Sequence, residues 1–224
     1  MITSKLLLYF IILLFPVTVL AQSTSTPKDT THYTRNFAYT TPVSKNTTIN
    51  GLAIGLMPEV WGGAKRLTIN GLNISLDPLS GTFGMAYALF GTAVAAFRTD
   101  TTEEYANDIF YHNMYPDAPD GYDVIIRGIS ISIGGLGGSI KVHGLAINGA
   151  ICFPDKMVGM EITGFMNKHY DFKGLMIAGL RNKTTTGKGV QIALFNSCKE
   201  GKVVQFGLIN KIGKRVLPIM NFSL

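Results

Sequence analysis

Charged residues are scarce in this chain, and so are cysteine and tryptophan. Only 15% of the 224 residues are Asp, Glu, Lys or Arg, whereas 46% are hydrophobic. This composition excludes a disordered polar chain, because such chains combine low hydrophobicity with high net charge. The length suits one domain of ordinary size with room for an appendage.

The small charge imbalance argues against a nucleic-acid partner. The formal net charge is +6, and the basic residues are scattered, with small groups only at Lys65-Arg66 and near Lys211 and Arg215. Nucleic-acid-binding proteins usually gather basic residues and aromatics on one face. Weak attraction to an anionic membrane or a polysaccharide stays open.

The usual catalytic and metal-binding motifs are also missing. The four histidines have no paired zinc spacing, and Cys152 and Cys198 do not form a C-x-x-C motif. No G-x-S-x-G nucleophile context occurs, and the glycines at 134–138 lack the Lys-Ser/Thr of a phosphate-binding loop. We therefore predict a non-enzymatic protein without a cofactor or a metal. A carbohydrate-active solenoid enzyme is the least favoured alternative, because Glu161 has no acidic partner in the other copies of the repeat described below.

The first 21 residues predict a secretory signal peptide. Lys5 supplies the positive start, residues 6–17 an apolar run, and Val19-Leu20-Ala21 a small-residue cleavage site before Gln22. The apolar run is too short for a membrane-spanning helix, and no stop-transfer pattern follows it. We expect the chain to be exported.

The most informative pattern is a phrase repeated five times between 144 and 210. The copies read G-L-A-I-N-G-A-I-C, G-M-E-I-T-G-F-M-N, G-L-M-I-A-G-L-R-N, G-V-Q-I-A-L-F-N and V-V-Q-F-G-L-I-N. They begin at positions 144, 159, 174, 189 and 203, so their spacing is nearly constant. Such a period is typical of repeat architectures. Two related phrases ending in proline occupy 49–58 and 69–78.

Within each copy, apolar residues alternate with small or polar ones, which predicts an all-β fold. We favour a parallel β-solenoid of about 15 residues per coil, with the aliphatic row filling a narrow interior. The alternative is a small antiparallel outer-membrane β-barrel acting as a pore or anchor. A membrane strand needs roughly 9–11 residues, more than each alternating run supplies, and Trp61 is the only tryptophan for an aromatic girdle.

The solenoid makes two further predictions about single residue types. Glycine at the start of each copy and asparagine at its end should lie at corners, and stacked asparagines should form a ladder from coil to coil. Cys152 and Cys198 lie three copies apart, about 14 Å along a stack with about 4.8 Å per layer. A disulfide needs Cα atoms within about 7 Å, so we expect two free, buried thiols.

The chain is divided into a signal peptide at 1–21, a Thr/Ser/Pro-rich leader at 22–46 and a single β repeat domain at 47–224. An insertion at about 79–123 interrupts this domain. It contains an expected short apolar helix at 80–97 and a polar, turn-rich loop at 98–123.

Two candidate binding surfaces follow from this arrangement. The first is the small-polar row of the repeat, with Glu161, Gln191 and Gln205, which we expect to face outward. The second is the loop with Asp117, Asp120 and Asp123, whose spacing does not fit a calcium loop.

The phrase G-[LV]-x-I-[GA]-L-F-N, the paired N-G-L-x-I-x-L starts and the ending K-R-V-L-P-I-M-N-F resemble a bacterial family. It comprises the exported surface repeat-containing proteins of Bacteroidota and spirochaetes. The resemblance covers about 49–78 and 124–222 and implies a place in the periplasm, outer membrane or cell surface of a Gram-negative bacterium. It implies no enzyme activity, and the envelope, polysaccharide or protein partner stays open.

Overall fold

The computed structural model describes residues 31–62, 64–78, 82 and 122–223. The expected signal peptide and most of the expected leader and helix lie outside the described residues, as do Asp117 and Asp120.

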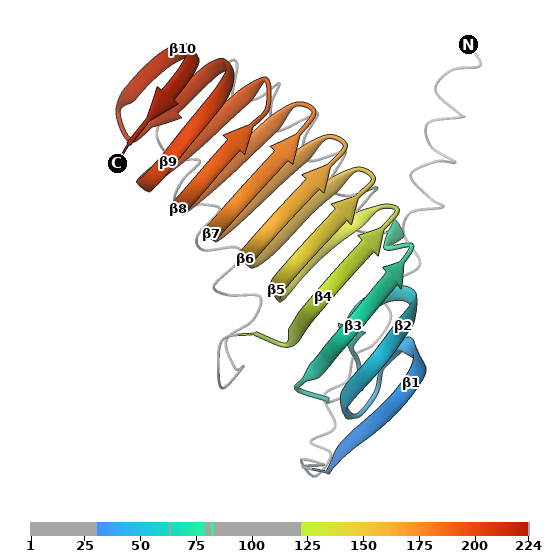
Figure 1. The fold of residues 1–224 in the computed structure, drawn as a ribbon. Helices are drawn as coiled ribbons and strands as arrows, with labels where there is room; N and C mark the ends of the chain where they lie inside the picture. Colours follow the sequence, from blue (N-terminus) through green and yellow to red (C-terminus); the bar gives the residue numbers. More distant parts are fainter. Residues whose placement is uncertain (1–30, 63, 79–81, 83–121, 224) are drawn as a thin grey trace, which may run out of the picture.

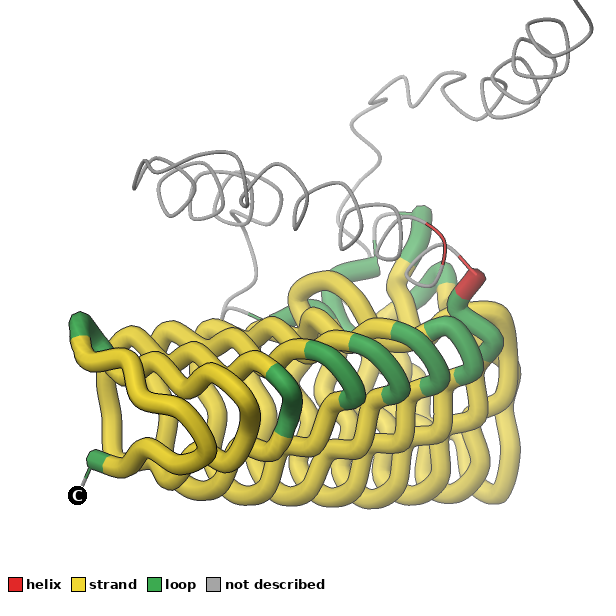
Figure 2. Tube along the Cα trace, turned by 90° about the horizontal axis from the view of Figure 1, so that it is seen from above, coloured by secondary structure: helices red, strands yellow, loops and turns green. Residues whose placement is uncertain are grey.

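The described chain is nearly all strand, and its strands stack along one axis (Figure 1). In chain order they are β1 (His32–Val43), β2 (Asn46–Val60), β3 (Leu67–Ser75), β4 (Val124–Ser132), β5 (Gly135–Asn148), β6 (Ile151–Thr163), β7 (Met166–Ala178), β8 (Arg181–Ile192), β9 (Phe195–Ile212) and β10 (Arg215–Phe222). They form one sheet in this same order. Figure 2 shows successive coils lying side by side, so the fold is a β-solenoid.

Neighbouring strands from β1 to β9 pair in parallel. Gly144, Gly159, Gly174 and Gly189 lie opposite one another in successive coils, so the step matches the period of the sequence. The predicted parallel solenoid is confirmed, and the antiparallel alternative is wrong for these nine strands.

The ends of the stack differ from the expectation. β1 falls in the expected leader, yet it pairs along its length with β2, so the solenoid begins before position 47. β10 turns back and pairs antiparallel with β9, which closes the C-terminal end with a hairpin. Among the described residues, no helix has the length and apolar character needed to cross a membrane.

The insertion between β3 and β4 leaves the stack in register. Gly71 lies opposite Gly128, although 57 positions separate them in the sequence. The residues on either side of this pair continue the same rows without a break. β4 therefore takes the position of the next coil after β3.

The inner and outer rows of the repeat are reversed relative to the expectation. One inner row, fully buried at 0% exposure, contains Ala53, Asn73, Ser130, Ala146, Glu161, Met176, Gln191 and Gln205. The aliphatic residues beside this row face outward, and Ile162 and Ile192 are 37% and 39% exposed. The prediction that the aliphatic row fills the interior is wrong.

The reason is that the interior receives its large side chains from another part of the coil. A second inner row consists of Ile49, Ile69, Ile126, Val142, Met157 and Phe172. Alternation identifies residues that share a face, but it does not say which face points inward. These residues lie two positions before the corner glycine. In β8 and β9 the same row continues with Gly187 and Gly201, so Gln191 and Gln205 occupy coils whose second inner row carries no side chain.

The core changes from apolar to amide-rich along the axis. The main hydrophobic cluster includes Ile49, Leu67, Ile126, Leu136 and Phe172. Near the C-terminal end, buried asparagines take over and form the predicted ladder. Asn167 Nδ2 donates to Asn182 Oδ1 at 3.0 Å, Asn182 Nδ2 donates to Asn196 Oδ1 at 3.0 Å, and Asn196 Nδ2 donates to Asn210 Oδ1 at 2.9 Å.

The corner glycines are required by both conformation and space. Gly144, Gly159, Gly174 and Gly189 have φ between +132° and +139°, a region that side chains rarely adopt. A Cβ atom on Gly174 would lie 1.9 Å from the carbonyl oxygen of Gly159. The predicted role of glycine at the corners is confirmed, and it depends on the close approach of one coil to the next.

Replacing a corner glycine should therefore destabilise the stack far more than replacing a turn glycine. We expect Gly174→Asn to lower the free energy of unfolding by about 3 kcal/mol or more, through backbone strain and the clash. Gly213→Asn is the matched control, because Gly213 has φ +57° and its Cβ would have its nearest contact at 3.5 Å. Asparagine tolerates that conformation. Equal losses for both variants in chemical denaturation would contradict the proposed role of the corner.

Candidate functional site

The structure places the expected binding residues of the repeat inside the solenoid. Glu161, Gln191 and Gln205 are each 0% exposed. Gln205 Nε2 donates to Gln191 Oε1 at 2.7 Å, and Gln191 Nε2 donates to Thr184 Oγ1 at 3.1 Å. The expectation that these three residues form an outer binding surface is wrong, because their side chains are buried and make their hydrogen bonds inside the core.

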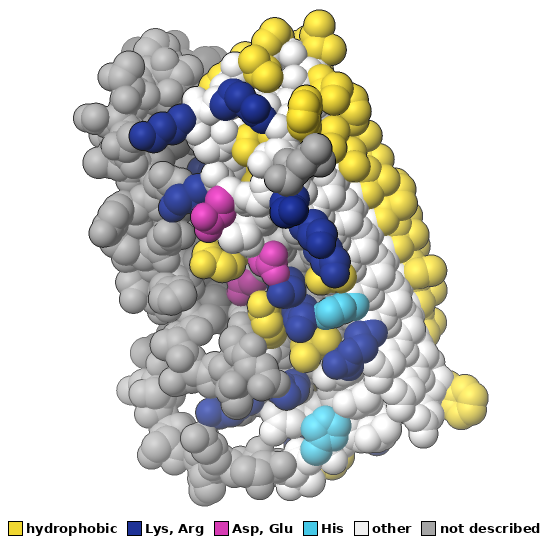
Figure 3. All heavy atoms as spheres, turned by 60° about the vertical axis from the view of Figure 1, so that its left-hand side comes forward, with side chains coloured by type: hydrophobic (Ala, Val, Ile, Leu, Met, Phe, Trp, Pro, Cys, Tyr) yellow, Lys and Arg dark blue, Asp and Glu magenta, His cyan; other side chains and the backbone are white. Residues whose placement is uncertain are grey.

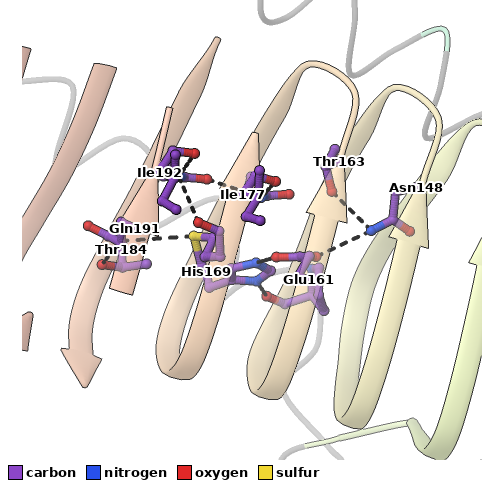
Figure 4. Close-up of polar contacts among 12 residues, drawn as sticks. Asn148, Glu161, Thr163, His169, Ile177, Thr184, Gln191 and Ile192 are labelled. Carbon is purple, nitrogen blue, oxygen red and sulfur yellow. Dashed lines mark hydrogen bonds and ion pairs between the residues drawn. The ribbon is translucent and has the colours of Figure 1, made fainter. Parts of the chain in front are cut away.

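Glu161 is the centre of a buried polar cluster (Figure 4). Its Oε2 lies 2.5 Å from His169 Nε2, and both side chains are 0% exposed. The other ring nitrogen, His169 Nδ1, is 2.7 Å from the carbonyl oxygen of Pro154, and Asn148 Nδ2 donates to Glu161 Oε1 at 3.3 Å. A carbonyl oxygen can only accept, and so can an ionised carboxylate, so this geometry fits a histidine that donates from both nitrogens.

The charges in this cluster agree with that protonation state. Burial alone would lower the pKa of His169, but the Glu161 charge, its hydrogen bond and the Pro154 carbonyl together raise it above 6.5. Burial, together with the neighbouring Glu161, raises the pKa of the Cys152 thiol well above its ordinary value. Cys152 and Cys198 are both free and buried, which confirms the prediction for the two thiols.

A substrate would have no access to this cluster, because its side chains are closed inside the coils. Within the part of the chain that the structure describes, no group of three or more His, Cys, Asp or Glu side chains could hold a metal ion. The Glu161–His169 pair links β6 and β7 inside the core.

Of the three acidic candidates Asp117, Asp120 and Asp123, the structure describes Asp123. It lies half-buried at the start of β4, and its carbonyl oxygen accepts a hydrogen bond from Leu67 N at 2.8 Å. Burial raises the pKa of its carboxyl group, and Arg66 partly opposes this shift. The pKa of Glu59 is also raised, first by burial and then by the charges of Asp77 and Asp123. Asp123 thus belongs to the base of the insertion.

The outer surface instead presents rows of aliphatic side chains, which the sequence reasoning assigned to the interior. One row contains Ile54, Ile74, Ile131, Ile147, Ile162, Ile177, Ile192 and Phe206. A neighbouring row contains Leu52, Leu72, Ile129, Leu145, Met160, Leu175, Val190 and Val204. We call these two rows the aliphatic face. Exposed leucine and isoleucine side chains continue it at Leu56, Leu76, Ile133, Leu194 and Leu208.

A column of basic residues runs along one edge of the aliphatic face. Directly before the corner position, which is glycine except for Val203 in β9, successive coils carry Arg127, His143, Val158, Lys173, Lys188 and Lys202. Figure 3 shows Lys and Arg side chains in a row down this side of the molecule, with hydrophobic side chains along the adjacent edge. We call the charged members, Arg127, Lys173, Lys188 and Lys202, the basic column. They are exposed.

The surroundings of the basic column keep its charge positive. No Asp or Glu occupies a position of this row in β4 to β9. Two residues before this row lies a second row, in which Lys156 engages Asp171, with Nζ and Oδ2 2.5 Å apart. Glu200 is the other acid of that row in β6 to β9 and is exposed. Burial and the charges of Lys141, Arg127 and Lys156 lower the pKa of His143, so this ring is neutral near pH 7. A signal for the column exists in the sequence, because a basic residue precedes the glycine of several copies.

Comparisons with known proteins leave the site to be interpreted from its own geometry. No family model matches the chain, and neither a curated protein nor a solved structure matches it.

The buried pair predicts a dependence of stability on pH. Because the pKa of His169 is raised above 6.5, its stabilising contribution is complete below that value. The contribution is lost as the pH rises through the higher folded-state pKa. We expect the free energy of unfolding of the wild type, relative to the double variant Glu161→Gln/His169→Gln, to fall as the pH rises above 6.5. A difference that stays constant over this range in urea denaturation would contradict the assignment.

The single variant Glu161→Gln provides the complementary test. It leaves a buried histidine without its carboxylate, which should cost about 3–5 kcal/mol at low pH. The double variant should be less destabilised, because it removes both charges together.

Proposed function

We propose that this chain is a non-enzymatic protein of the bacterial cell envelope whose repeat stack serves as a scaffold with a binding surface. The observation that carries the proposal is the aliphatic face, which continues over eight successive strands, from β2 to β9. Soluble monomers rarely leave so continuous an apolar patch exposed, and such patches usually mark sites of interaction.

The regularity of the face supports a scaffold role. Each coil contributes the same two outward positions, so the surface is extended in one direction and nearly uniform along it. Solenoid proteins commonly use extended surfaces of this kind for binding. The Glu161–His169 pair is buried in the core and closed to ligands. The proposal therefore assigns no reaction to this pair.

An envelope location is supported by the amino-acid sequence. Residues 1–21 have the composition of a secretory signal peptide. The repeat phrase resembles that of exported bacterial surface proteins, which agrees with this location.

Fractionation of a Gram-negative host that expresses the full chain tests the proposal. We expect the protein in the envelope, with a mature N-terminus at Gln22. The variant Leu13→Arg interrupts the apolar run and should leave an unprocessed chain in the cytoplasm. Wild-type protein that stays unprocessed in the cytoplasm would refute the envelope assignment. The measurement combines immunoblots of the fractions with N-terminal sequencing.

A further inference from the structure

We infer that the aliphatic face and the basic column together dock the solenoid onto an anionic lipid surface, with the solenoid axis lying along the membrane. This inference deepens the proposed envelope function and rests on it, because it names the partner of the same surface. The protein would lie on one leaflet without crossing it.

The shape of the aliphatic face suits the interfacial region of a bilayer. Its rows run through eight strands, so seven steps of about 4.8 Å give a length of about 34 Å. Four residues of about 3.3 Å each, from the row of Leu52 across the row of Ile54 to the exposed residues beyond it, give a width of about 13 Å. The side chains in the two rows are aliphatic, apart from Phe206 and the thioether of Met160. Such a surface can enter the boundary between headgroups and acyl chains without leaving a polar side chain unsatisfied.

The position of the basic column provides the charge complementarity. Lys173, Lys188 and Lys202 lie in consecutive coils, and each is only two residues before a member of the aliphatic face or its continuation. A lysine at the edge of a buried apolar surface can extend its ammonium group toward the headgroups. Basic residues near an anionic leaflet strengthen binding, and added salt weakens this contribution.

A lipid fits the surface better than a second protein. The projected area of the aliphatic face is about half of the roughly 800 Å² per partner that a standard protein interface buries. Such an interface also carries on the order of ten hydrogen bonds, whereas the side chains of these two rows offer no hydrogen-bonding group. The four members of the basic column lie on one edge and are all positive, so pairing two copies column to column would bring like charges together.

Flotation with lipid vesicles tests the inference. The probes are vesicles of phosphatidylcholine alone and of phosphatidylcholine with equimolar phosphatidylglycerol, and the protein is purified from the envelope of expressing cells. We expect flotation with the anionic vesicles, and less of it at high salt. The variant Lys173→Gln/Lys188→Gln/Lys202→Gln should weaken partitioning about fivefold for each charge removed. The variant Ile162→Gln/Ile177→Gln/Ile192→Gln should weaken it about tenfold or more.

Matched controls separate these effects from changes in net charge or folding. Lys168→Gln/Lys183→Gln/Lys199→Gln removes three charges from residues that do not flank the aliphatic face, and it should change partitioning about twofold or less. Tyr170→Gln removes a side chain that is 60% exposed on another side of the coil. It should leave flotation unchanged. Circular dichroism and thermal unfolding confirm that each variant is folded.

The possible outcomes distinguish this inference from the envelope proposal. An envelope protein that ignores both kinds of vesicle overturns the lipid assignment alone. Equal flotation of the isoleucine variant and the wild type does the same. A concentration-dependent dimer that is lost in the isoleucine variant, with flotation unchanged, would identify a second copy as the occupant and would also overturn it. Cytoplasmic wild-type protein refutes the envelope proposal, whatever the vesicles show.

Discussion

The structure depends on the close contact between successive coils at the corner glycine. There the carbonyl oxygen of one coil occupies the space that a Cβ atom of the next would need, as for Gly159 and Gly174. This contact keeps equivalent residues directly above one another in the parallel ladder. Because equivalent residues are aligned, side chains of similar chemistry form rows along the stack. The amide ladder is such a row inside the solenoid, and the aliphatic and basic rows are such rows outside it. A change of register by one residue would mix these rows and expose the amides.

Much of the fold was predictable from the sequence because the period of the repeat is also the length of the coil. Strand direction followed from the short alternating runs, the glycine corners from their fixed position, and the Asn167–Asn210 ladder from asparagine at the end of each copy. The unpaired thiols followed from the distance between coils. The start of β1 was not predictable, because its sequence lacks the repeat phrase although its backbone follows the same path.

The site was predicted less well. Alternation left open which row faces inward, and the prediction chose the aliphatic row because of its hydrophobicity. Burial of the aliphatic row would have satisfied the usual preference of apolar residues for the interior. The interior instead takes Met157 and Phe172 from the second inner row in β6 and β7. In β8 and β9 that row has only Gly187 and Gly201, and the first inner row supplies Gln191 and Gln205. Both glutamines can be buried because each finds a hydrogen-bonding partner in the core or an adjacent coil, as Gln205 does with Gln191. The basic column was visible in the sequence only once the corner had been located.

The hairpin between β9 and β10 has a consequence for how this protein can vary in length. β10 carries Pro218, which has no backbone N–H, and its register shifts between Leu217 and Ile219. Both features make it a poor template for a further strand. Growth by adding coils at this end is therefore blocked, whereas whole repeats can be gained or lost between β5 and β9 without disturbing the cap. Each such event would lengthen or shorten the outer face by one strand spacing. The length of this face along the solenoid axis can therefore change in steps of one coil.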